Sequence, residues 1–392
     1  MKFPHQFRSL LLGVCILVQT TLAAAQQASP NFDFDGKYLV GITSKGPSGM
    51  GATVWSARNG ELVQRIAHQE SIVRVELAPD GNSVLTSSFH PPNELSIRSK
   101  DDSIRVWTIP GGKESLRIRN ATYGQFSRDG KRIYGFSRRP SSKSSATTFD
   151  VSAWDSKDGK LIFTATLPGA GETLSSRYTL QENAGRSKLL YFGSGFMAVF
   201  DSVTGKPVIE PVRTIAGFSV LGLLTPSGDE AQVAEIRHVR YFSALTGGEV
   251  KKITFPLESA WWVGLQPTGQ GFAAVSVFGD LVYYDRKTDR MTQAKSTMKS
   301  IGSVFVREDG RLFYVDWGGG YADGAAVPQI VTALDAETCK QVWERPGRII
   351  SRFGEDQLVI LGWPEEVSIV HALSGAVLRK FMLRGFVSPS EE

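Results

Sequence analysis

The stretches VELAPDGNSVLTSS (75–88) and IRVWTIPGGKESLRI (104–118) decide the fold, because together they form a unit that recurs along the whole chain. In each unit an apolar stretch runs into a polar turn, often Asp-Gly, and a second apolar stretch follows. A third apolar stretch, often with an aromatic residue, leads through another polar turn into a fourth. The first halves of the eight units lie at 32–42, 75–88, 124–137, 178–194, 222–235, 263–276, 304–317 and 350–363.

The local pattern predicts four short antiparallel strands in each unit. Asp-Gly, Thr-Gly and Asn-Gly pairs are typical of tight hairpins, because Gly and Asn tolerate a positive φ. Apolar runs such as 358–361 indicate strands that are buried on both faces. No segment of the sequence shows sustained helical periodicity.

The repeat period predicts how the units pack. The first-half turns begin at residues 35, 80, 129, 184, 227, 268, 309 and 355, so the period is 41 to 55 residues. One four-stranded sheet cannot bury both of its faces, whereas sheets packed radially around an axis can. We therefore predict an all-β fold, a β-propeller of eight four-stranded antiparallel blades; the alternative is seven blades and one capping unit. The expected single domain spans 26–384, with units near 31–67, 68–118, 119–167, 174–212, 215–255, 258–295, 299–345 and 347–384.

These units resemble the blades of WD-repeat and quinoprotein-like β-propellers over residues 31–384. The first halves are similar to the Phe-Ser-Pro-Asp-Gly run of that family, and the second halves to its Val-Trp-Asp-x-x-Thr-Gly run. In the second unit the resemblance implies a structural tetrad that joins its members by hydrogen bonds. A metal or catalytic role is the competing interpretation for its histidine. The tetrad consists of His68, Ser87, Asp101 and Trp107.

The segment ALDAETCKQVW (333–343) resembles the tryptophan-docking motif of quinoprotein propellers. Ala333, Asp335, Thr338 and Trp343 fall on its positions, and Cys339 stands where Gly is usual. In that family the motif ties neighbouring blades together, so it implies no quinone. We expect no cofactor.

The N-terminus has the pattern of a secretory signal. Lys2 and Arg8 form a basic region, an apolar stretch follows at 10–18, and Ala23 and Ala25 fit an Ala-x-Ala cleavage site. We expect cleavage after Ala25 and a secreted or periplasmic protein. A lipoprotein anchored at Cys15 is the alternative, although Val14 stands where a small residue is wanted.

The mature chain has one cysteine and no candidate membrane span. Cys15 would leave with residues 1–25, so Cys339 has no partner for an internal disulfide. No later stretch approaches the roughly 20 apolar residues that a spanning helix needs. We expect residues 385–392 to form a disordered tail, and the oligomeric state stays open.

Basic residues concentrate in one part of the chain. The net charge of +5 becomes +3 without residues 1–25, and the segment 94–143 alone carries +7. Such a sector favours an acidic partner, either a protein or an anionic component of the cell envelope. Nucleic acid is disfavoured by export and by the lack of interleaved aromatic residues.

Two insertions are candidate binding loops. The first holds Arg138, Arg139 and Lys143, which could contact an acidic surface; the alternative is a solvated loop. The second, at 317–328, holds Trp317 and Tyr321 among glycines, where aromatic rings could stack on a sugar. The alternative is that these rings pack back on the blade.

A catalytic set is not recognisable in the sequence. The histidines His68, His90, His238 and His371 share no metal-type spacing, so we predict neither catalytic residues nor a metal site. The leading hypothesis is an exported, non-catalytic scaffold that binds a partner through blade-edge loops. The alternative is a secreted enzyme with its site at the axial channel, either a glycan lyase or hydrolase or a quinoprotein-like oxidoreductase.

Overall fold

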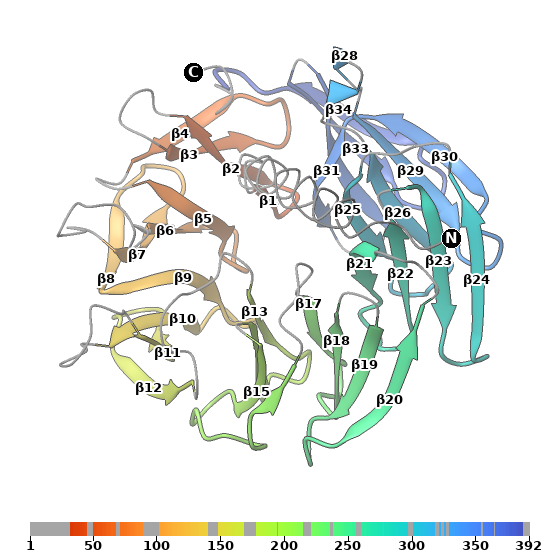
Figure 1. The fold of residues 1–392 in the computed structure, drawn as a ribbon. Helices are drawn as coiled ribbons and strands as arrows, with labels where there is room; N and C mark the ends of the chain where they lie inside the picture. The colour runs from red at the N-terminus through yellow and green to blue at the C-terminus, as the bar shows by residue number, and fades with distance from the viewer. Residues whose placement is uncertain are drawn as a thin grey trace, which may run out of the picture.

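The protein is an all-β propeller of eight blades, as the repeats predict. Figure 1 shows the sheets arranged around a central axis, with the first strand of each blade nearest to it. Within the described part of the chain there is no helix, and the seven-bladed alternative is excluded. The computed structural model describes residues 32–44, 50–67, 71–88, 102–139, 148–167, 178–193, 195–214, 221–235, 238–255, 260–276, 278–296, 301–317, 321–322, 325–326, 329–353, 356–363 and 365–386.

Every blade is built from four strands that follow one another in the chain. Blade 1 contains β1 (Phe32–Phe34), β2 (Tyr38–Ser44), β3 (Met50–Ser56) and β4 (Leu62–Ile66). Blade 2 contains β5 (Ile72–Leu77), β6 (Ser83–Ser88), β7 (Ser103–Thr108) and β8 (Glu114–Arg119). Blade 3 contains β9 (Ala121–Phe126), β10 (Arg132–Arg139), β11 (Thr148–Asp155) and β12 (Leu161–Thr166). Blade 4 contains β13 (Tyr178–Glu182), β14 (Lys188–Gly193), β15 (Phe196–Asp201) and β16 (Val212–Arg213).

The second half of the ring repeats this order. Blade 5 contains β17 (Leu221–Leu224), β18 (Glu230–Ala234), β19 (His238–Ser243) and β20 (Glu249–Thr254). Blade 6 contains β21 (Ala260–Leu265), β22 (Gly271–Ser276), β23 (Asp280–Asp285) and β24 (Arg290–Lys295). Blade 7 contains β25 (Ile301–Val306), β26 (Leu312–Trp317), β29 (Ile330–Asp335) and β30 (Gln341–Pro346), with the small hairpin β27 (Tyr321–Ala322) and β28 (Ala325–Ala326) between its second and third strands. Blade 8 contains β31 (Arg348–Phe353), β32 (Gln357–Leu361), β33 (Glu366–His371) and β34 (Val377–Met382).

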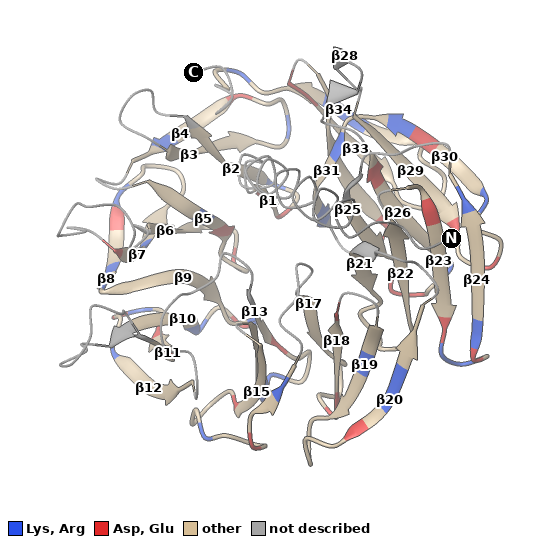
Figure 2. Ribbon diagram, viewed as in Figure 1, with Lys and Arg blue, Asp and Glu red and all other residues tan. Residues whose placement is uncertain are grey.

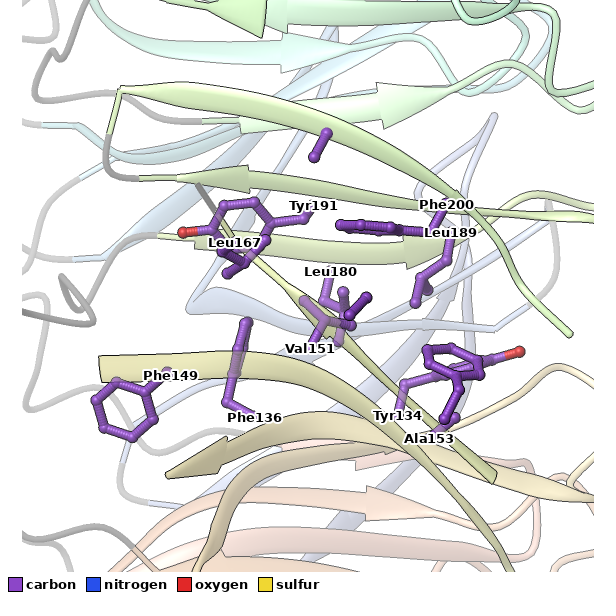
Figure 3. Packing of buried hydrophobic residues seen from close by; sticks show 13 residues of the cluster. Tyr134, Phe136, Phe149, Val151, Ala153, Leu167, Leu180, Leu189, Tyr191 and Phe200 are labelled. Carbon is purple, nitrogen blue, oxygen red and sulfur yellow. The ribbon is translucent and has the colours of Figure 1, made fainter. Parts of the chain in front are cut away.

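The hydrophobic core lies between successive blades. Figure 3 shows one of these layers, where side chains from blades 3 and 4 meet. Phe136 of β10 and Tyr191 of β14 make an edge-to-face contact there, with ring centroids 5.8 Å apart. Eight such clusters of buried residues occupy the eight blade junctions, so each blade is stabilised mainly by its two neighbours.

The outer strands bend at a recurrent irregularity. In six blades the register between the third and fourth strands shifts by one residue, which is the signature of a β-bulge. A bulge increases the local twist and so lets the outer strand follow the ring. The shifts lie at Val54/Trp55, Val106/Trp107, Ala153/Trp154, Tyr241/Phe242, Ala333/Leu334 and Ile369/Val370.

Trp343 links blade 7 to blade 8, which is the role implied by the resemblance to the docking motif. Its Nε1 donates a hydrogen bond to the carbonyl oxygen of Ala372, 2.9 Å away. Its ring lies so close to Gly375 that a Cβ there would come within 2.7 Å of it. Asp335 shapes the turn before Trp343, because its Oδ1 accepts hydrogen bonds from the backbone N–H and the hydroxyl of Thr338.

Candidate functional site

The two faces of the ring differ in their connections. On one face the second strand of each blade joins the third and the fourth joins the next blade; we call it the variable face. Its connections range from one residue, as between β8 and β9, to residues 89–102 between β6 and β7. On the opposite face, the turn face, the connections are short hairpins in every blade except between β15 and β16. Because loops of unequal length on a rigid frame are typical binding elements, the variable face is the candidate site.

Among the described residues of the variable face, Phe278 is one of two large aromatic side chains that are exposed. It lies in the turn between β22 and β23, and 61% of its surface is exposed. The hydroxyl of Ser276 accepts hydrogen bonds from the backbone N–H groups of Phe278 (3.2 Å) and Asp280 (3.1 Å). The same hydroxyl donates to Oδ2 of Asp280, 2.9 Å away. The turn is therefore braced, and it holds Phe278 outward.

Trp363 is the second exposed aromatic residue on this face. It lies in the turn between β32 and β33, and 87% of its surface is exposed. Backbone hydrogen bonds close this turn, from Gly362 N to Glu366 O (2.7 Å) and from Glu365 N to Gly362 O (3.1 Å). A third bond, from Leu383 N to Glu365 O, ties it to the end of the chain. A large apolar ring is thus presented to solvent by a fixed backbone.

The predicted basic loop lies mostly outside the described residues. Arg138 and Arg139 end β10, and their backbones pair with Phe149 and Thr148 of β11. Their side chains and Lys143 are not described. The strand ends place this loop on the variable face, and its role in binding stays a prediction.

Part of the basic segment is neutralised within blade 2. Arg105 is only 6% exposed, so it adds little to the surface charge. Glu114 contacts both Arg105 (3.1 Å) and Arg117 (2.7 Å), and the hydrogen bond from Arg117 lowers the pKa of Glu114. Figure 2 shows basic and acidic residues on both halves of the ring. The count of Lys and Arg in this segment therefore overstates its surface charge.

Trp317 and Tyr321 differ in what the structure shows of them. Trp317 ends β26, is 2% exposed and packs in the core between blades 6 and 7, which agrees with the alternative that its ring packs back on the blade. Tyr321 begins the β27–β28 hairpin on the variable face. Its side chain lies outside the described residues.

The predicted tetrad is described only in part. Trp107 donates a hydrogen bond from Nε1 to Oγ1 of Thr86, 2.8 Å away, and not to Ser87. Ser87 instead accepts a hydrogen bond from the backbone N–H of Gly124 in blade 3. Neighbouring residues of a strand point to opposite faces, so Ser87 faces blade 3 while Thr86 shares the other face with Trp107. This corrects the expected hydroxyl partner; the tetrad itself stays a prediction, because His68 and Asp101 lie outside the described residues.

Carboxylates on the innermost strands connect neighbouring blades. Oδ2 of Asp33 in β1 accepts a hydrogen bond from Leu77 N of blade 2, 2.7 Å away. Oε1 of Glu76 in β5 accepts one from Phe126 N of blade 3, 3.3 Å away. The innermost strands are where an axial catalytic site would be expected, but these contacts favour a bracing role for both acids.

Two buried acids, Glu76 and Asp316, have raised pKa values. Burial raises the pKa of Glu76 to about 7, against the attraction of Arg74, whose Nη2 lies 3.5 Å from Glu76 Oε2. Arg74 also donates to Oε1 of Gln125, 3.2 Å away. Burial likewise raises the pKa of Asp316 in blade 7 to about 7, with Arg348 of blade 8 opposing the shift.

Cys339 is a buried thiol rather than a reactive one. It is 5% exposed and packs in the core between blades 6 and 7. Desolvation, and then the negative charge of Asp335, raise its pKa to about 11. At neutral pH the thiolate is therefore scarce.

Neither a metal-binding cluster nor a membrane-spanning helix occurs in the described part of the chain. There, no group of three or more His, Cys, Asp or Glu side chains is placed to hold a metal ion. The same residues include no helix with the length and hydropathy of a membrane span.

Sequence reasoning missed Phe278 and Trp363. Both lie next to turn residues, in Phe278-Gly279 and in Gly362-Trp363-Pro364. An aromatic residue inside a Gly- or Pro-containing turn, rather than in the adjoining strand, was the available signal. Trp363 is the last residue of the repeat first half 350–363, and Phe278 lies just beyond the first half 263–276.

The structure is similar to several solved propellers. The C-terminal WD40 domain of Sif2 matches with a TM-score of 0.59 and 12% identity, over 88% of this chain and 97% of that one. Sqt1 of Chaetomium thermophilum, bound to the N-terminus of the ribosomal protein L10, matches with a TM-score of 0.60 and 14% identity, over 91% and 97%. The dihydro-heme d1 dehydrogenase NirN matches with a TM-score of 0.59 and 13% identity, over 93% and 76%.

These similarities establish a propeller fold, shared with WD40 propellers, and at such low identities they establish nothing more. No family model and no curated protein matches the sequence.

Proposed function

We propose that the protein is an exported, non-catalytic scaffold that binds a protein partner through its variable face. The exposed ring of Trp363, 87% accessible on a hydrogen-bonded turn, carries this proposal. Trp is enriched among the residues that dominate protein interfaces, and a fixed backbone lowers the entropic cost of binding. Phe278, two blades away on the same face, is a second anchor.

The comparisons support a protein as the partner. Sqt1, one of the similar propellers, is bound to the N-terminus of a ribosomal protein in its solved structure. By analogy the present chain would use its ring as a rigid frame and its variable face for contact. Arg138, Arg139, Lys143 and Tyr321 would then extend the contact surface beyond the two aromatic anchors.

Export is part of the proposal and rests on the sequence of residues 1–25. A basic start, a short apolar stretch and an Ala-x-Ala site together direct a chain into the secretory route. The mature scaffold would begin at Gln26 and act outside the cytoplasm, secreted or in a periplasm.

The test is capture with residues 26–392 from the cell envelope, followed by affinity measurement with the protein recovered. We expect the double variant Phe278→Ala and Trp363→Ala to weaken binding by roughly 30-fold or more, the loss typical of interface hot spots. The matched control is Leu245→Ala, which removes a side chain that is 59% exposed on the turn face.

Equal affinity of the double variant and the control would refute the aromatic anchors. A triple variant with Glu at positions 138, 139 and 143 tests the basic loop separately. Its binding should fall most at low salt, where charge contacts are strongest. Unchanged binding there would remove the basic loop from the interface.

A further inference from the structure

Blades 8 and 1 close the ring as two separate sheets, with no strand exchanged between them. Each blade consists of consecutive strands, so no described sheet combines strands from both ends of the chain. After β34 the chain leaves blade 8 and continues across the surface of blade 1. We call residues 383–386 the strap, and the blade 1 residues that hold it the strap site. The strap site consists of Phe32, Trp55, Gly60 and Arg65.

The strap is held through its backbone, as a bound peptide is. Nε1 of Trp55 donates to the carbonyl oxygen of Arg384, 3.1 Å away. Nη2 of Arg65 donates to the carbonyl oxygen of Gly385, 2.7 Å away. Arg384 N in turn donates to Gly60 O, 3.1 Å away. Side chains and backbone of blade 1 thus satisfy three backbone polar groups of the strap.

Two strap side chains enter apolar surroundings. Leu383 is 2% exposed and belongs to the core between blades 8 and 1. The ring of Phe386 lies 6.3 Å from that of Phe32 and 5.9 Å from that of Trp55, measured between centroids. These contacts place Gly385 and Phe386 on the propeller rather than in the expected tail.

Gly385 is the residue type that its position requires. Its φ is +68°, a left-handed conformation that other residues adopt at a cost. A Cβ there would also lie 2.9 Å from Nη2 of Arg65, which holds the neighbouring carbonyl. The strap site therefore selects a glycine followed by an aromatic residue.

We propose that the strap site is a peptide-binding site, occupied in cis by residues 383–386. In trans it takes a partner segment with the pattern Leu-x-Gly-Phe that adopts the same turn. The cis strap is then an internal competitor, and a partner peptide gains access when the strap leaves. Backbone recognition supplies affinity, while the positive φ and the ring contacts with Phe32 and Trp55 supply selectivity.

The experiment measures fluorescence anisotropy of a labelled peptide, LRGFVSPS, which corresponds to residues 383–390. One receptor is the chain truncated after Met382; the other is the full chain with Phe386→Ala, which keeps the length of the strap. We expect saturable binding to both, and weaker binding to the wild-type chain, whose site is filled. Peptides carrying Gly385→Ala or Phe386→Ala should bind roughly tenfold more weakly, or worse.

Controls distinguish binding at the strap site from nonspecific binding of the peptide. Leu245→Ala, introduced into the full-length receptor, removes an exposed side chain from the turn face of blade 5 and should not change the affinity. Arg65→Ala should weaken it. The proposal fails if neither receptor, shown to be folded by circular dichroism, binds the peptide. It also fails if the Phe386→Ala peptide binds as tightly as the native one. Should the truncated chain not fold, the full-length receptor decides alone.

Discussion

At the scale of single residues, the burial of Glu76 matters most. Its carboxyl group accepts a hydrogen bond from the next blade, but burial removes its hydration. This loss disfavours the charged form and raises the pKa to about 7. Sequence could not reveal this, because an acid in an inner strand becomes desolvated only when the neighbouring blades close over it.

The raised pKa predicts a specific pH dependence of stability. Above pH 4.5 the unfolded chain releases the proton of Glu76 while the folded chain keeps it until about pH 7. The free energy of unfolding therefore falls across this window, by up to about 1.4 kcal/mol per pH unit for one proton. Glu76→Gln keeps an acceptor for Phe126 N and should remove the contribution of Glu76 to the pH dependence of the free energy of unfolding. Asp316, whose pKa is also about 7, should retain its own share.

Urea unfolding at pH 4.5, 6 and 7.5 measures this slope. Glu366→Gln is the control, because Glu366 lies on the exposed side of β33 and pairs with Lys380. A slope in Glu76→Gln equal to that of the wild type would contradict the assignment.

Cys339 allows a second test at this scale. Its φ of +54° is left-handed, and the residue stands where the related docking motif has Gly. We expect Cys339→Gly to change the free energy of unfolding by less than about 1 kcal/mol. Cys339→Val should lower it by about 2 kcal/mol, because β-branched residues are strained at positive φ. Equal effects of the two substitutions in thermal unfolding would contradict the conformational argument.

At the scale of strands and blades, one contact recurs at three of the blade junctions. An aromatic side chain of a fourth strand packs against a glycine of the following blade. The sequence revealed this contact only at Trp343, where the full motif is present. Elsewhere the ring of Phe163 packs against Gly205, and the ring of Phe381 lies beside Gly60 together with the backbone of Met382. Those junctions escaped detection because the contact needs only a ring and a glycine, not the surrounding motif.

Replacing either of two tryptophans by alanine should therefore lower the stability to very different extents. Trp343→Ala removes a buried ring and its hydrogen bond to blade 8, so we expect a loss of about 3–5 kcal/mol in the free energy of unfolding. Trp363→Ala removes an exposed ring and should change it by less than about 0.5 kcal/mol. Chemical denaturation of both variants makes the comparison. Similar losses in the two would show that the docking contact is not structural.

At the scale of the whole molecule, the two ends of the described chain meet. The strap ends beside β1, with the rings of Phe32 and Phe386 in contact. Because every blade is made of consecutive strands, the order in which blades follow one another can be changed without dividing a sheet.

A circular permutant tests this architecture. Joining Phe386 to Phe32 by a short Gly/Ser linker and opening the chain between β24 and β25 leaves all eight sheets intact. We expect a folded ring, with the far-UV circular dichroism of the parent and cooperative unfolding. Opening the chain between β22 and β23 instead divides blade 6 and should lower the unfolding midpoint. If the first permutant failed to fold while the second folded, the sheet assignment would be wrong.

The amino-acid pattern was enough to predict the number of blades, their strand order and the position of the tight turns. These depend on local signals, namely alternating apolar residues and turn glycines, that are repeated eight times. Only the tertiary structure decided which residues face solvent and which face another blade. Trp317 is buried and Trp363 is exposed. Each of these outcomes depends on how neighbouring blades and connections pack, and a repeat pattern within one blade does not specify that contact.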